Sequence, residues 1–185
     1  MVHMIRSKWF LLFVGILIQS ISLIGQDDWK IYEDPKGRFK ISTPNILELK
    51  EHELKTELGI LTTDSYIYDA GKETDNFLYT INISNYQDGT FPSDSTDLIE
   101  DFLSETILSI KESVSGEIKY TAPLDSPRLG LGKVYRVAYD EGYVIIKGKV
   151  FLKNNQFISL QVFTTLKKAL NPSIDEFLDT FELIE

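Results

Sequence analysis

The stretch from Lys133 to Thr165 constrains the fold most strongly, because it consists of three apolar runs separated by two short turn sequences. β-Branched and aromatic residues dominate the runs, and turn-forming residues occur at Asp140-Glu141-Gly142 and at Asn154-Asn155. The pattern predicts a three-stranded antiparallel meander. The other segments of the chain can then be placed by how they pack against it.

The register of the meander depends on the turn lengths, because side chains alternate between the two faces of a strand. At the second turn, a three-residue loop would pair Leu152 with Ile158, whereas a two-residue Asn154-Asn155 turn would pair Leu152 with Phe157. A shift of one residue moves a whole set of side chains to the other face. We favour the three-residue loop of residues 154–156, with an asparagine in the left-handed region at a bulge.

This register predicts one continuous apolar face and one mixed face. The first turn pairs Tyr139 with Val144 and Val137 with Ile146. The apolar face would hold the aliphatic side chains Val144, Ile146, Val150 and Leu152 of the second strand and Ile158, Leu160 and Val162 of the third. The opposite face would carry the mixed set Ile145, Lys147, Lys149, Phe151, Ser159, Gln161 and Phe163, which we expect to be half covered.

The segment Met1–Gly25 has the features of a secretory signal peptide. Arg6 and Lys8 precede an apolar run at residues 9–18, which is shorter than the about 20 apolar residues that a membrane-spanning helix needs. Cleavage after Gly25 would leave a single domain at residues 26–185, located in the periplasm or outside the cell. An uncleaved membrane anchor is the alternative, because Leu23 is not the small residue usual at that position before the cleavage site.

Composition limits the classes of function. The chain of 185 residues is 43% hydrophobic, which is enough for one core. Arg6 and Lys8 are two of its 19 basic residues and no acid precedes Asp27, so the remainder carries 17 basic and 28 acidic residues, a net charge of −11. This charge argues against binding of nucleic acids or anionic lipid surfaces. The absence of cysteine excludes disulfides, thiolate metal sites, a cysteine nucleophile and a lipidated cysteine.

The remaining elements alternate between strands and helices. The expected strands are residues 29–33 and 38–42 around an Asp-Pro-Lys-Gly turn, 60–68, 77–86 and 117–122, with residues 123–132 as a loop. Residues 47–58 could form an edge strand or a short helix, and we favour the edge strand. A long helix should begin at residues 93–95 and end at Gly116, covering the apolar face of the meander. A closing helix should be capped by Asn171, begin with Pro172, and bury Ile174, Phe177, Leu178 and Phe181.

The element order and three segments resemble a known fold family. The segments are GRFKISTP at residues 37–44, LGLGKVYRVAY at 129–139 and FLDTFELIE at 177–185. Together they resemble the PsbP-like family, whose fold is shared by the extrinsic photosystem subunit PsbP, a Ran-binding nuclear-transport factor and bacterial secreted proteins of unknown function. The resemblance implies an α+β fold, an α/β/α sandwich of a mostly antiparallel sheet with a long helix and a C-terminal helix. It also implies a non-enzymatic binding or accessory role. No PsbP metal- or photosystem-binding residue matches a position in this chain.

No residue pattern indicates a catalytic, metal or cofactor site. His52, the one histidine after the N-terminal segment, lies among charged residues and is expected to be solvated. The acids Asp69, Glu73 and Asp75 lack the ligand spacing of a calcium loop. Asp125 and Arg128 are expected in an ordinary connecting loop. We therefore expect no catalytic, metal-binding or cofactor-binding residues and no cofactor.

The sequence leaves three hypotheses for the function. The preferred one is a secreted or periplasmic non-catalytic module that binds another cell-envelope protein, for which a shallow apolar patch is expected. A hydrolase built on carboxylates would show two of them facing each other across a cleft. A carrier of a small apolar ligand would show an enclosed apolar cavity under the long helix.

Overall fold

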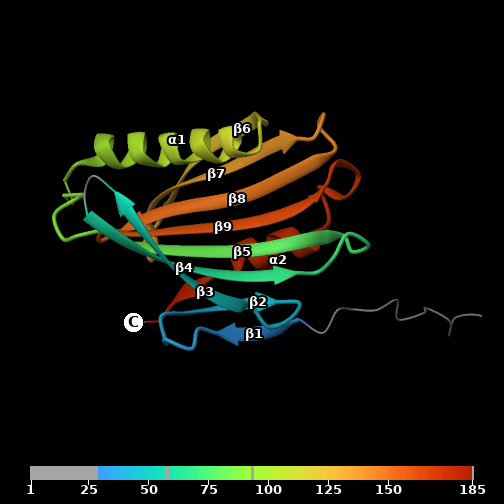
Figure 1. Ribbon diagram of the computed structural model, residues 1–185, viewed down its shortest axis with the longest axis horizontal. Helices are drawn as coiled ribbons and strands as arrows, with labels where there is room; N and C mark the ends of the chain where they lie inside the picture. Colours follow the sequence, from blue (N-terminus) through green and yellow to red (C-terminus); the bar gives the residue numbers. More distant parts are fainter. Residues whose placement is uncertain (1–28, 57–58, 93, 185) are drawn as a thin grey trace, which may run out of the picture.

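A computed structural model describes residues 29–56, 59–92 and 94–184. The predicted signal peptide, Met1–Gly25, lies outside these residues. The main element is a seven-stranded antiparallel sheet with the order β3-β4-β5-β9-β8-β7-β6 (Figure 1). Its strands are β3 (Glu48–Thr56), β4 (Gly59–Asp69), β5 (Asn76–Asn85), β6 (Glu117–Ser126), β7 (Gly130–Tyr139), β8 (Val144–Lys153) and β9 (Gln156–Thr165).

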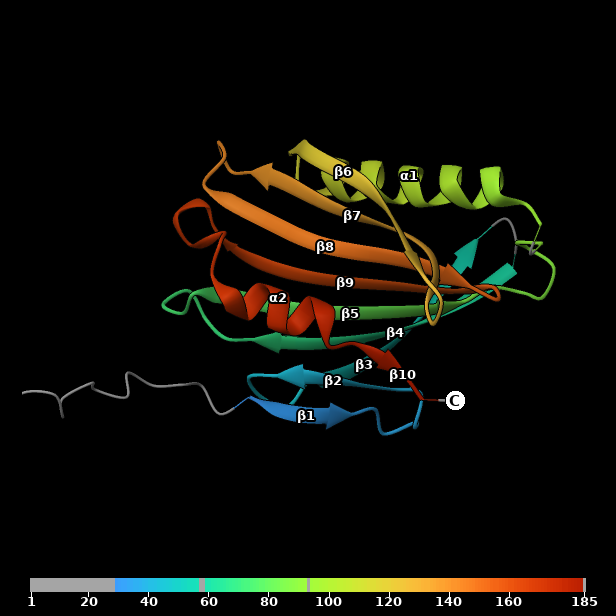
Figure 2. The same ribbon diagram turned by 180° about the vertical axis from the view of Figure 1, so that it is seen from behind.

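Each face of this sheet is covered by different elements. Helix α1 (Thr96–Ser113) lies on one face, and helix α2 (Pro172–Asp179) lies on the other (Figures 1 and 2). A small antiparallel sheet of the order β1-β2-β10 packs beside α2; its strands are β1 (Lys30–Glu33), β2 (Phe39–Thr43) and β10 (Glu182–Leu183). The expected α+β fold, mostly antiparallel with a long and a C-terminal helix, is therefore confirmed.

The core divides into two hydrophobic clusters, one on each face of the large sheet. On the first face, α1 buries Ile99, Leu103 and Ile107 against side chains of β7 and β8. On the second face, α2 buries Ile174, Phe177 and Leu178 with strand residues of both sheets. Phe181, the fourth residue of the predicted stripe, is buried in the same cluster but follows the end of the helix. Burial of a large apolar side chain stabilises the fold by roughly 1.5–3 kcal/mol, so both helices are held mainly by packing.

The predicted three-residue loop between β8 and β9 is wrong. Lys153 pairs with Gln156 and Leu152 pairs with Phe157, which leaves a two-residue turn. Asn154 and Asn155 both have positive φ angles, 48° and 62°, as the tight hairpin turn that matches strand twist requires. The predicted pairing at the other turn, Val137 with Ile146, is confirmed.

The predicted single apolar face of the meander is therefore also wrong. The second-strand set that contains Ile146 and Val150 faces α1, whereas the third-strand set that contains Ile158 and Leu160 faces α2. The supposed mixed set is divided in the same way: Ile145, Lys147, Lys149 and Phe151 lie on the α2 face, and Ser159, Gln161 and Phe163 lie on the α1 face. Because α1 and α2 pack on opposite faces of the sheet at the meander, apolar residues occur on both sides of β8 and β9, and the apolar pattern does not determine the register.

Three further predictions concern single elements: a loop, an edge strand and a helix cap. The supposed loop at residues 123–132 is mostly a hairpin, because β6 continues to Ser126 and β7 begins at Gly130. Pro123 is tolerated there because β6 is an edge strand. The expected edge strand at residues 47–58 is confirmed as β3. Asn171 occupies the N-cap position of α2 as predicted, but its side chain bonds to Asn76 and to the Lys168 carbonyl instead of capping the helix.

Candidate functional site

Part of the sheet face on the α1 side has no helix over it. Helix α1 packs mainly on β7, with further contacts to β8 and β6. In both views of the described part of the chain, α1 lies along β6 and β7 and away from β4 and β5 (Figures 1 and 2). Side chains of β4, β5 and β9 on this face line a pocket beside the helix.

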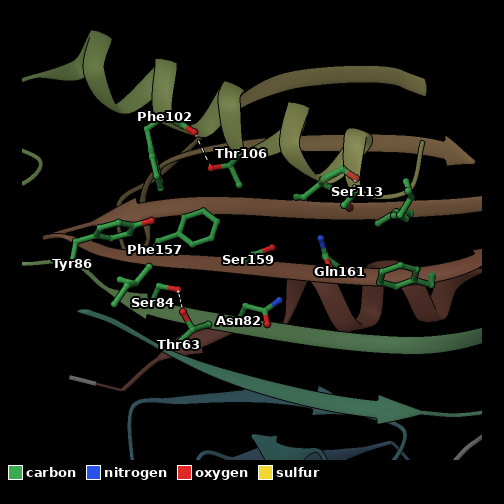
Figure 3. A pocket seen from close by; sticks show the side chains of 15 residues that line it. Thr63, Asn82, Ser84, Tyr86, Phe102, Thr106, Ser113, Phe157, Ser159 and Gln161 are labelled. Carbon is green, nitrogen blue, oxygen red and sulfur yellow. Dashed lines mark hydrogen bonds between the residues drawn. The ribbon is translucent and has the colours of Figure 1, made fainter. Parts of the chain in front are cut away.

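A groove of about 440 Å³ lies along this boundary (Figure 3). One wall comes from α1 and consists of Phe102, Thr106, Ile110 and Ser113 with Val114 directly after the helix. The strand residues that line it are Leu61 and Thr63 of β4, Asn82 and Ser84 of β5, Ile146 of β8, and Phe157, Ser159, Gln161 and Phe163 of β9. Tyr86, which follows β5, completes the lining. The volume is within the range of ligand pockets, but the groove is open along one side.

Hydrogen bonds fix the polar floor of the groove. The hydroxyls of Thr63 and Ser84 are 2.7 Å apart, and Ser65 donates to Asn82 Oδ1 at 2.7 Å. Gln161 Nε2 donates to the Tyr135 hydroxyl at 2.8 Å. The floor is therefore held in one arrangement before anything binds, which reduces the ordering entropy of binding.

Asn82 retains hydrogen-bonding capacity toward the groove. Its Oδ1 accepts from Ser65, which is the one side-chain hydrogen bond of Asn82 to the residues that the structure describes, and its amide nitrogen donates none to them. An amide nitrogen carries two donors. Both are available to a carbonyl or hydroxyl oxygen of a bound molecule.

Buried Tyr135 depends on a glycine in the neighbouring strand. A Cβ atom at Gly148 would lie 2.5 Å from the Tyr135 hydroxyl, so no other residue fits there without a shift. Burial raises the pKa of Tyr135, so its hydroxyl stays protonated and available to Gln161. Gly148 thus contributes indirectly to the shape of the groove floor.

The described residues that line the groove carry no charge. None of these fifteen residues is Asp, Glu, His, Lys or Arg, although a quarter of the chain is charged. Among them Tyr86 is the one titratable group, and burial raises its pKa, so it stays neutral. These fifteen side chains can donate and accept hydrogen bonds and contact apolar groups, but none of them is a general acid or base suited to chemistry near neutral pH.

Aromatic rings close one end of the groove. Tyr86 and Phe157 each contact Phe102 edge-on, with ring centroids 5.5 and 5.4 Å apart. Phe91, in the connection before α1, lies 4.7 Å from Phe102. Its backbone N–H donates to Asn155 Oδ1 at 2.7 Å, so the β8–β9 turn also holds this connection. The cluster fixes the start of α1 relative to the sheet.

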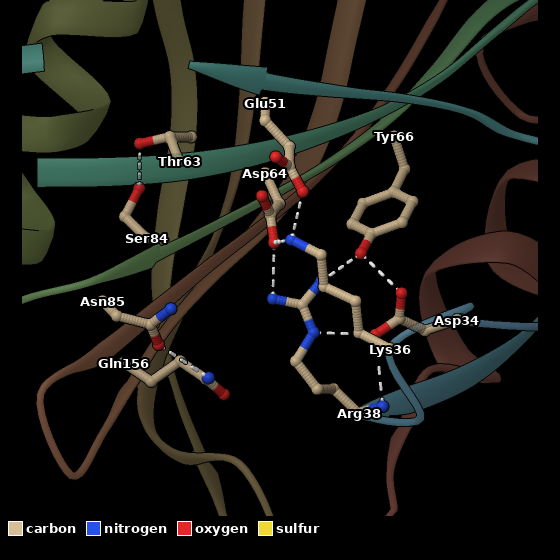
Figure 4. Close-up of polar contacts among 10 residues, drawn as sticks. All are labelled: Asp34, Lys36, Arg38, Glu51, Thr63, Asp64, Tyr66, Ser84, Asn85 and Gln156. Atoms are coloured by element: carbon tan, nitrogen blue, oxygen red, sulfur yellow. Dashed lines mark hydrogen bonds and ion pairs between the residues drawn. The ribbon is translucent and has the colours of Figure 1, made fainter. Parts of the chain in front are cut away.

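A cluster of charged residues lies on the other side of the large sheet (Figure 4). Arg38 joins two buried carboxylates, with Nε 2.7 Å from Asp34 Oδ2 and a terminal nitrogen 2.6 Å from Asp64 Oδ2. Tyr66 donates to Asp34 Oδ1 at 2.6 Å and accepts from Arg38. Lys36 contacts Asp64 at 2.8 Å and Glu51 at 2.5 Å. The cluster thus connects the β1–β2 hairpin to β3 and β4.

The two buried carboxylates of this cluster, Asp34 and Asp64, are ionised under ordinary conditions. Burial would raise the pKa of Asp34, but hydrogen bonds from Arg38, Tyr66 and the backbone outweigh it and hold the pKa below its usual value. Asp64 is affected in the same way: burial is outweighed by Lys36 and Arg38, and its pKa is lowered. Both carboxylates bind one guanidinium and do not face each other across a cleft, so the cluster gives no support to the hydrolase hypothesis.

The structure does not bring the residues weighed in the sequence together. His52 is exposed in edge strand β3, opposite Thr63. Asp69 accepts a backbone N–H from Gly71 at 3.0 Å, and Asp75 pairs with Lys168 at 2.7 Å. Within the residues described, no three His, Asp or Glu side chains are grouped so as to hold a metal ion.

The other two candidates lie in the β6–β7 hairpin. Asp125 belongs to β6 and not to the predicted loop, and its side chain is exposed. Arg128, in the turn, is exposed and 4.0 Å from Glu182. Neither residue contributes to the groove.

Sequence reasoning missed the groove. The one available signal was the row of small polar residues in otherwise apolar strands, namely Thr63, Asn82, Ser84, Ser159 and Gln161. In the predicted register, which is incorrect, Ser159 and Gln161 lay on the mixed face, for which no function was predicted.

Among the described residues there is no helix long and apolar enough to cross a membrane.

Comparison with solved structures defines the class of fold. The solution structure of cyanobacterial PsbP (CyanoP) from Synechocystis matches 90% of this chain and 98% of its own, with a TM-score of 0.53 and 16% sequence identity. The chain therefore has the PsbP-like fold. A protein of unknown function from Pseudomonas aeruginosa matches more weakly, with a TM-score of 0.42 and 8% identity over 78% of this chain and 88% of its own. The sequence matches no protein-family model, and it matches none of the curated proteins.

Proposed function

We propose that this chain is an exported, non-catalytic accessory domain that binds another cell-envelope protein through the groove beside α1. The uncharged and pre-ordered lining of the groove is the observation that carries the proposal. It offers hydrogen-bond donors, acceptors and aromatic contacts, which are the components of a recognition surface. The likeness of its fold to that of the extrinsic protein PsbP supports the same class of function by analogy.

A protein segment fits the groove better than a small apolar ligand does. A carrier needs an enclosed apolar cavity, whereas this groove is open along one side and has a floor of hydroxyls and amides. The backbone N–H and C=O groups of a bound segment would match the free Asn82 amide and the floor hydroxyls. Its uncharged side chains would contact Phe102, Ile110 and Phe157.

Export is a testable part of the proposal. We expect the protein made in its native host to begin near Gln26 and to be found in the periplasm or the medium, because residues 6–18 have the basic and apolar pattern of a signal peptide. N-terminal sequencing of the purified protein decides this. A chain that begins at Met1 and sediments with membranes would be an anchored protein. A chain that begins at Met1 in the cytosol would remove an envelope partner from consideration.

Binding in the groove can be tested by photo-crosslinking in the native host. An aliphatic diazirine amino acid replaces Ile110, which lines the groove, or Leu108, which is exposed on the solvent side of the same helix. We expect a discrete crosslinked product from position 110 and none from position 108, because only the groove holds the partner. Mass spectrometry identifies the partner and the segment that it contributes.

Two results would contradict the proposal. The same product from both positions would indicate contact that does not depend on the groove. If position 110 gives no product while the variant folds normally and is exported, then the groove has no protein occupant in the cell.

A further inference from the structure

Two cations lie directly opposite each other on the sheet face that carries α2. Arg136 of β7 pairs in register with Lys147 of β8, and Lys147 is opposite Val162 of β9, which belongs to the core cluster of α2. Like charges opposite each other in an antiparallel pair destabilise a sheet. Such a pair is usually neutralised by nearby acidic side chains.

Neither cation has a partner in the part of the chain that the structure describes. Three arginines lie in this part of the chain. Arg38 and Arg128 both lie near carboxylates: Arg38 pairs with Asp34 and Asp64, and Arg128 lies near Glu182. The side chain of Arg136 makes no ion pair or hydrogen bond there. The Nε atom of Arg136 is buried without an acceptor.

The surroundings leave this pair accessible. Helix α2 packs on β9 and β8, and Figure 2 shows β6 and β7 without a helix over them on this face. Lys149, two residues after Lys147 and on the same face, is held by Asp179 of α2. Tyr120 of β6 is opposite Arg136 on its other side and is 44% exposed. Arg136 and Lys147 are thus partly exposed between a tyrosine and a neutralised lysine.

We propose that Arg136 and Lys147 form a binding site for a phosphate group. The outer nitrogens of a guanidinium form a planar fork that donates two parallel hydrogen bonds to an oxyanion, and an ammonium adds a point charge. Two uncompensated positive charges on neighbouring positions match the charge of a phosphate monoester dianion. The site lies on the opposite face of the sheet from the groove, so it does not depend on the proposed function.

Because the protein is acidic overall, long-range attraction cannot draw an anion to the Arg136–Lys147 pair. The chain is acidic overall, with a charge of −9, and repels anions at long range. An anion that binds must therefore be held by local contacts, and its affinity should depend on these two side chains. We expect weak, saturable binding at low ionic strength.

The test is a titration of the isotope-labelled protein with inorganic phosphate at constant ionic strength, followed by NMR. We expect saturable shifts of the backbone amides around residues 136 and 147 and of the Arg136 side-chain N–H. Arg136→Gln should weaken binding about tenfold or more, because it removes the charged fork, and Lys147→Gln should weaken it less. Lys72→Gln, the same change of charge in an exposed loop, should leave binding unchanged.

Two further ligands identify the source of the phosphate. Glycerol 3-phosphate represents a soluble monoester, and vesicles of phosphatidylcholine containing phosphatidic acid represent a lipid headgroup. Binding of either one that is lost in Arg136→Gln supports the site and names its source. Shifts of equal size with chloride or acetate, or wild-type affinity in Arg136→Gln, would overturn the proposal.

Discussion

Replacing Arg38 with methionine is expected to lower the free energy of unfolding by about 3–5 kcal/mol at pH 7, because it leaves buried Asp34 without a cation and buried Asp64 with Lys36 alone. The Asp34 and Asp64 side chains are 0% and 4% exposed, so water cannot replace the guanidinium. Urea denaturation followed by circular dichroism measures the change. Lys40→Met is the matched control, because Lys40 pairs with Glu182 at the surface, where such a pair contributes about 0–1 kcal/mol.

The pH dependence of this effect has a definite sign. The pKa values of Asp34 and Asp64 are lowered in the folded protein, so their contribution to stability is present above their unfolded pKa of about 4 and is lost as the pH falls through the folded values. In Arg38→Met, burial without the cation should raise both pKa values. The difference in unfolding free energy between wild type and variant should therefore shrink between pH 7 and pH 3. A difference that stays constant, or a loss no larger than that of Lys40→Met, would show that the cluster does not hold the two sheets together.

Leu160→Asp is expected to prevent folding. Leu160 is fully buried in β9, within the cluster that includes Ile81, Ile158 and Phe177. An unpaired carboxylate there costs several kcal/mol in addition to the lost packing, and a domain of this kind has a total stability of about 5–15 kcal/mol. Far-UV circular dichroism and gel filtration of the purified variant measure the outcome.

Phe163→Asp provides the control for this prediction in the same strand. Phe163 lies on the opposite face, is half-buried and lines the open groove, so its carboxylate can reach water. We expect this variant to fold with a lower urea midpoint. A Phe163→Asp variant that is less stable than Leu160→Asp would contradict the positions of the two faces.

The strands and helices could be predicted from the sequence because their apolar spacing is regular. The stripe of α1 and the β-branched runs of β7, β8 and β9 are examples. The register at Asn154-Asn155 could not be predicted from this spacing, because Phe157 and Ile158 are both apolar and both faces of the sheet are covered. The conformation of the asparagine pair, with two positive φ angles, decides it instead.

The two polar sites are assembled from residues that are distant in the sequence. Arg38 meets Asp64 and Tyr66 through the packing of two sheets, and neither sheet carries a motif that indicates the contact. The groove depends on where α1 stops covering the strands, which is a property of tertiary packing. Small hydroxyl and amide residues such as Ser84 and Asn82 are common in strands that face water, so their sequence pattern alone did not distinguish a site.

The central claim is that the groove beside α1 binds a partner protein. Its most direct test uses a peptide of the partner segment that crosslinking identifies, and titration calorimetry measures the affinity of this peptide for two tryptophan variants of α1. Ser113→Trp places an indole in the groove, whereas Leu108→Trp places the same group on the solvent side of the helix. We predict that Ser113→Trp lowers the affinity about tenfold or more and that Leu108→Trp binds like wild type, because filling a recognition groove removes its central contacts. Equal affinities for the two folded variants would contradict binding through the groove.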